Sequence, residues 1–114
     1  MSDKKYRLRF QEEFQGPILR GEKSATMRFG KPKPFQVGDI VGLTHGLFDK
    51  YDEAFAHARI TEKRTILWRD VTDADLARTG ADRKWYEGRY PTIQGCTVGE
   101  FIGFDLVSKE AARG

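Results

Sequence analysis

The sequence predicts a small α+β domain, a mixed β-barrel with short peripheral helices. Its 114 residues suit a single domain spanning 1–114. Apolar patterns typical of strands recur along most of this length. Helical patterns occur once early in the chain and as a pair late in it, which favours helices placed around a sheet. The expected strands are 6–10, 24–28, 40–43, 54–60, 64–68 and 98–107.

The N-terminal half alternates strands with one helix. Apolar and arginine side chains alternate over 6–10, as in a half-buried strand. A short helix is expected over 11–20, ended by Gly21 in a left-handed conformation. The strand at 24–28 has small apolar residues on one face and polar residues on the other. A Gly-Asp turn at 38–39 leads into the third strand.

The C-terminal half contains a helical pair before the last strand. Asp70 or Thr72 can cap a helix that runs to a stop near Gly80. A second helix is expected over 82–89, and the Tyr-Pro pair at 90–91 ends it.

The composition excludes several classes of protein. No apolar run approaches the roughly 20 residues of a membrane-spanning helix, and 1–10 lacks the apolar core of a signal peptide. The single cysteine, Cys96, excludes an internal disulfide framework and a cysteine-rich zinc site. We therefore expect a cytoplasmic protein that acts without a metal or cofactor and away from membranes.

Charge is uneven along the chain. The net charge is +3, yet residues 1–34 hold nine Lys or Arg against four Asp or Glu, and 35–114 hold eleven against thirteen. The basic segment could attract RNA or another phosphate-bearing partner. A soluble surface with scattered charge is the plainer interpretation.

Residues 21–28 contain the densest cluster of reactive groups. A lysine in a partly apolar pocket beside Arg28 would lose proton affinity, and neutral Lys23 could then take the proton of Thr26 or Ser24. Positions 23 and 26 point to opposite faces of a continuous strand. They converge only if Lys23 lies in the turn after Gly21. The alternative is an ordinary strand whose polar face meets solvent.

The cluster resembles the GxKxxxxR signature of ASCH domains, small β-barrels related to the PUA fold. Lys23 and Arg28 occupy the two charged positions of that signature. The flanks agree with the family at Phe14, Ile18, Leu19, Phe35, Gly38, Asp39, Tyr90, Pro91 and 101–106.

Within that family, the run at 18–28 is most similar to the short bacterial amidohydrolases that act on N4-acetylcytidine, which carry ILxGxKTxTxR. The resemblance implies that Thr26 is the nucleophile and Lys23 its activating base. It also implies a substrate-binding role for Arg28, beside which Ser24 replaces the usual threonine. Tyr90 or Trp85 could stack on the cytosine ring. The reaction would release cytidine and a carboxylate, with a modified nucleoside as the small-molecule partner.

The third catalytic member of that subgroup, a glutamate, has no single counterpart here. Alignment on the threonine that opens the helix places Thr79 at its position, whereas alignment on the Tyr-Pro pair places Asp75 there. Glu87 is the only glutamate of the region and could protonate a leaving group. Asp75 and Glu87 are therefore the candidate acids, and the protonated form of Lys23 is the alternative donor of a proton to the departing amine. Two other functions stay open, a non-catalytic RNA-binding module and a ribonuclease.

Overall fold

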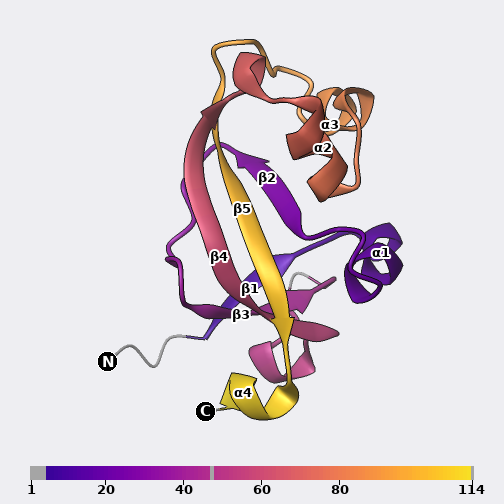
Figure 1. Cartoon of the computed structure of the whole chain (residues 1–114), viewed down its shortest axis with the longest axis vertical. Helices are drawn as coiled ribbons and strands as arrows, with labels where there is room; N and C mark the ends of the chain where they lie inside the picture. The colour runs from indigo at the N-terminus through magenta and orange to yellow at the C-terminus, as the bar shows by residue number, and fades with distance from the viewer. Residues whose placement is uncertain (1–4, 47, 114) are drawn as a thin grey trace.

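The structure, a computed structural model, describes residues 5–46 and 48–113. The segments with alternating apolar residues form five strands, which pair into one sheet of order β1-β3-β4-β5-β2 (Figure 1). The strands are β1 (Tyr6–Arg9), β2 (Ala25–Phe29), β3 (Ile40–Thr44), β4 (Ala56–Leu67) and β5 (Val98–Val107). β1 pairs with β3 in parallel, and the other neighbours are antiparallel. The predicted α+β class is confirmed.

The sheet is open and does not close into a barrel. Within the described ranges the ladder ends at β1 on one side and β2 on the other. A side chain bridges this gap, because Nη2 of Arg28 donates to the carbonyl oxygen of Arg9 over 2.6 Å. A side-chain contact in place of a backbone ladder leaves space between the two edge strands.

The predicted strands at 54–60 and 64–68 are one strand, β4. Its register against β5 shifts between Ile60 and Glu62, and pairing then continues to Leu67. The polar residues that we expected to interrupt it face partners instead: Lys63 forms an ion pair with Glu100 of β5 at 3.0 Å. A bulge absorbs the irregularity without ending the strand.

Short helices surround the sheet. α1 (Gln15–Leu19), α2 (Asp73–Thr79) and α3 (Arg83–Arg89) lie on one side of it near β2, and α4 (Lys109–Arg113) lies beyond the end of β5 (Figure 1). The described residues also form three 3₁₀ turns, η1 (Glu12–Phe14), η2 (Tyr51–Glu53) and η3 (Trp68–Asp70). The helix expected over 11–20 is thus η1 followed by α1.

Among the described residues, two apolar clusters form the core. One joins β1, η1, α1, β3, β4 and β5 around Leu8, Phe14 and Ile60, and the other joins β2, β4, β5, α2 and α3 around Met27 and Phe101. Ala81 and Trp85 pack against both clusters. In the part of the chain that the structure describes, no helix has the length and apolarity to cross a membrane.

Candidate active site

The turn after α1 sets the position of Lys23. Gly21 adopts φ 78°, a left-handed conformation that favours glycine. The backbone N–H groups of Glu22 and Lys23 then both donate to the carbonyl of Pro17, at 2.9 and 3.1 Å. Lys23 therefore precedes β2 and lies in the turn, as convergence with Thr26 requires.

The ammonium group of Lys23 is enclosed in the core. Only 2% of the residue is exposed. Nζ donates to the carbonyl of Ala25 at 3.0 Å and to that of Thr79, and it lies 4.6 Å from the ring centroid of Phe14. Among the described residues it forms no ion pair with a carboxylate. Burial, followed by the charge of Arg28, lowers the pKa of Lys23 to about 7.

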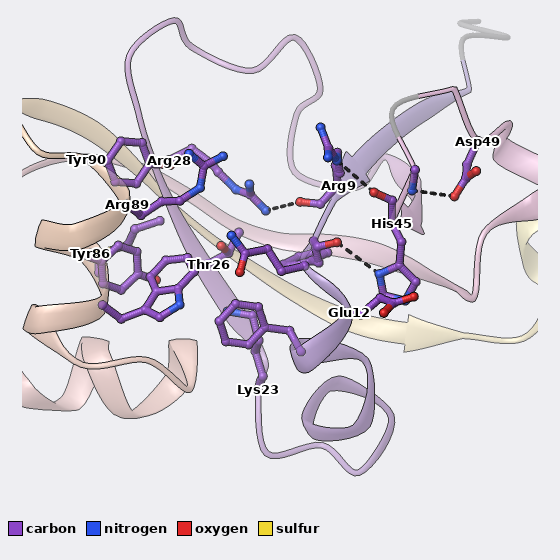
Figure 2. Close-up of a pocket in the computed structure, with 16 residues that line it drawn as sticks. Arg9, Glu12, Lys23, Thr26, Arg28, His45, Asp49, Tyr86, Arg89 and Tyr90 are labelled. Atoms are coloured by element: carbon purple, nitrogen blue, oxygen red, sulfur yellow. Dashed lines mark hydrogen bonds between the residues drawn. The ribbon is translucent and has the colours of Figure 1, made fainter.

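Lys23 and Thr26 line the same cavity, whose volume is about 620 Å³. Thr26 is 4% exposed. In the described structure, its hydroxyl forms no hydrogen bond with Lys23. Figure 2 shows both residues between Tyr86 and Arg89 on the α3 side of the cavity and Arg9 and His45 on the opposite side. The wall comprises Arg9, Phe10, Gln11, Glu12, Phe14, Lys23, Thr26, Met27, Arg28, His45, Gly46, Asp49, Trp85, Tyr86, Arg89 and Tyr90.

Arg28 is a half-buried cation in the cavity wall. Its guanidinium lies 4.9 Å from the ring centroid of Phe10 as well as bonding the Arg9 carbonyl. Its Nε–H is buried and has no acceptor among the described residues. Burial is the main influence lowering the pKa of Arg28, although a guanidinium stays protonated in proteins. A buried donor without a partner is rare, and a ligand oxygen in the cavity would satisfy it.

Aromatic side chains form the α3 side of the cavity. Trp85 and Tyr86 pack edge to face at 4.9 Å, and Phe14 meets Trp85 in the same way at 5.2 Å. Tyr90 follows α3 and contacts Phe29 of β2. Rings in such a wall can hold a planar ligand by stacking or edge contacts.

The two predicted acids lie outside this cavity. Asp75 caps α2 together with Thr72 and forms an ion pair with Arg64 at 2.7 Å. Glu87 is exposed on α3 and does not line the cavity. Ser24 is also directed elsewhere, because its hydroxyl accepts from Nε of Arg78 at 3.5 Å.

Thr79 stands where one alignment places the missing glutamate. The residue is fully buried, and its hydroxyl donates to the carbonyl of Leu76 at 2.8 Å. Its own carbonyl accepts from Lys23. A backbone oxygen therefore contacts the lysine at this position. α2 holds that oxygen in place because Gly80, at φ 71°, ends the helix there.

Four further charged residues line the cavity without having been predicted there: Arg9, Glu12, Asp49 and Arg89. The polar face of the first strand was a weak signal for Arg9, and nothing in the local pattern indicated the others. His45 also lines the cavity, but both ring nitrogens are engaged, by the carbonyl of Phe10 and the amide of Gln15. No group of His, Cys, Asp and Glu able to hold a metal occurs within 5–46 and 48–113.

Comparison with known proteins identifies the fold. No family model and no curated protein matches the sequence. The ASCH domain from Lactobacillus crispatus superposes with a TM-score of 0.60 at 19% identity, over 80% of this chain and 68% of that chain. A variant of the ASCH protein from Zymomonas mobilis gives 0.63 at 14%, over 95% and 71%. A protein from Enterococcus faecalis gives 0.68 at 12%, over 94% and 83%. The chain thus has the fold of an ASCH domain.

Proposed function

We propose that the protein is an amidohydrolase that cleaves the N4-acyl amide of nucleosides such as N4-acetylcytidine, with Thr26 as nucleophile and Lys23 as base. The observation that carries the proposal is the state of Lys23. A buried lysine with a pKa of about 7 and no carboxylate partner in the described structure is half neutral near neutral pH, beside a threonine in one cavity. Serine-lysine acyl-transfer sites use the same pairing of amine and hydroxyl.

The hydrogen bonds of Lys23 suit a base. A neutral amine has two N–H donors and one lone pair. The carbonyls of Ala25 and Thr79 can accept both hydrogens, which leaves the lone pair for the proton of the Thr26 hydroxyl. The same contacts restrict rotation of the amine, so the lone pair keeps one direction.

The first half of the reaction follows from these roles. Lys23 takes the hydroxyl proton as the Thr26 oxygen bonds to the acyl carbon. The carbonyl oxygen becomes an oxyanion, and Arg28 supplies the nearby positive charge and an unpaired donor. As the bond from the acyl carbon to N4 breaks, the Lys23 ammonium returns the proton to the departing amine. Cytidine leaves, and the acyl group remains as an ester on Thr26.

The cavity fits a substrate of this kind. Its volume of about 620 Å³ lies within the usual range for small-molecule pockets, roughly 300–1,000 Å³. Trp85, Tyr86 and Tyr90 supply a wall for a pyrimidine ring, and the acyl group would lie beside Thr26. No cofactor takes part in this scheme.

The test is hydrolysis of N4-acetylcytidine by the purified protein, followed by ultraviolet absorbance. Thr26→Val and Lys23→Met should abolish turnover, whereas Thr26→Ser should keep part of it because it keeps a hydroxyl. Ser24→Ala is the matched control, since that hydroxyl lies outside the cavity, and it should retain turnover. Full activity in Thr26→Val would refute the nucleophile, and an inactive wild type would refute the function.

A further inference from the structure

An acyl-threonine must be hydrolysed before the enzyme can turn over again. That step needs a base that can reach water. Lys23 is poorly placed for it, because only 2% of the residue is exposed and its amine lies away from bulk water. A second group on the solvent side of the cavity would complete the cycle.

The cavity wall contains two carboxylates, Glu12 and Asp49, among the described residues. Asp49 is engaged by its own loop, because its carboxylate accepts from the backbone N–H of Gly46 at 2.7 Å. Glu12 is exposed, and within the described structure its side chain makes neither a hydrogen bond nor an ion pair. Figure 2 shows it on the side of Arg9 and His45, across from Tyr86 and Arg89.

The segment that carries Glu12 is fixed close to Lys23. Glu12 begins η1, and Phe14 ends it. The ring of Phe14 is buried, lies 4.6 Å from Nζ of Lys23 and packs on Trp85. One short turn therefore places an aromatic ring against the lysine and a carboxylate at the open side of the same cavity.

We propose that Glu12 is a catalytic residue, the general base that hydrolyses the acyl-threonine. The carboxylate takes one proton from water as the water oxygen bonds to the acyl carbon. The bond from that carbon to the Thr26 oxygen then breaks, and this oxygen receives the proton that Glu12 took from the water, which restores both the hydroxyl and the carboxylate. The products are a carboxylic acid, which ionises in solvent, and free Thr26. This role rests on the amidohydrolase proposed above.

Glu12→Gln tests the role, and Glu13→Gln is the matched control. Glu13 lies in the same turn but outside the cavity wall, where it accepts from Nε1 of Trp85 at 3.4 Å. Pre-steady-state mixing with N4-acetylcytidine should show one rapid equivalent of cytidine from Glu12→Gln, and then turnover about 10²-fold or more below wild type. Mass spectrometry should find one acetyl group on Thr26. Glu13→Gln should match wild type in both measurements.

The outcomes separate the two proposals. Wild-type turnover by Glu12→Gln, or slow turnover without a burst and without acetylated Thr26, would overturn the role of Glu12 while leaving the amidohydrolase intact. A wild-type protein that neither releases cytidine nor becomes acetylated would overturn the amidohydrolase itself. A burst in Glu12→Gln alone would support both.

Discussion

Lys23 is deeply buried, and yet both its neutral and its protonated form are accessible near neutral pH. The core solvates the ammonium form poorly, and Arg28 repels it, so the pKa falls to about 7. An aspartate or glutamate partner would reverse this effect by stabilising the charge. Two backbone carbonyls hold the amine instead, and they do so in either protonation state.

The pH dependence of kcat/KM should therefore report Lys23. A base works only after losing its proton, so kcat/KM should rise about tenfold per pH unit below the pKa and level off above about pH 7. Stopped-flow or steady-state assays between roughly pH 5 and 9 would measure the profile. Lys23→Arg should be inactive throughout, because a guanidinium does not deprotonate. A wild-type profile that is flat below pH 7 would contradict the assignment.

Residues of the site differ in how far the sequence predicts them. Lys23, Thr26 and Arg28 lie within one short segment, and Gly21 provides the turn that brings the first two together. Local spacing is enough for such a set. Glu12 is different, because its entry into the cavity depends on the crossing from the end of β1 toward β2, where Arg28 donates to the carbonyl of Arg9. That crossing is a long-range property, which no local pattern contains.

At the scale of the element, α2 explains why Asp75 is absent from the cavity. Thr72 and Asp75 bond to each other's backbone N–H groups and so cap the helix. Arg64 of β4 donates to the other carboxylate oxygen of Asp75, Oδ1. Burial opposes ionisation, yet the bonds from Thr72 and Arg64 hold the pKa of Asp75 below its usual value. The carboxylate of Asp75 thus caps α2 and links this helix to the sheet.

Asp75→Ala should accordingly affect stability and leave the chemistry unchanged. Loss of the cap and of the ion pair should lower the free energy of unfolding by about 1–2 kcal/mol, measured by urea denaturation. The kcat for N4-acetylcytidine should stay at the wild-type value. Asp73→Ala, exposed in the first turn of the same helix, is the control and should cost less. A large fall in kcat with unchanged stability would instead restore Asp75 as the catalytic acid.

β4 illustrates the limit of periodicity at this scale. The polar run at 61–63 interrupts the apolar alternation and predicts two strands. In the fold, this run is still paired with β5, and Glu62 forms ion pairs with Arg64 and with Arg78 of α2. A polar strand segment is stable where charged partners from another element cover it, and those partners are remote in sequence.

For the whole molecule, the sequence predicts the class but not the closure of the sheet. Alternation shows which side chains of β1 and β2 face the core, and it carries no information on the strand that each one pairs with. β1 pairs only with β3 and β2 only with β5 in the described structure, so the gap between them becomes the cavity. Residues of both apolar clusters line this cavity, among them Phe14 of one and Met27 of the other.

A ligand in that gap should stabilise the entire fold, because it would contact both clusters. With Thr26→Val to prevent turnover, N4-acetylcytidine at about 100 times its Kd should add about 2.7 kcal/mol and raise Tm by roughly 10 °C, measured by scanning calorimetry. Adding Tyr90→Ala should reduce the shift, since that ring belongs to the wall. Adding Glu87→Gln, outside the wall on the neighbouring α3, should leave it unchanged. Equal shifts in these two double variants would place the ligand elsewhere, and no shift in any of them would mean that the gap does not bind the nucleoside.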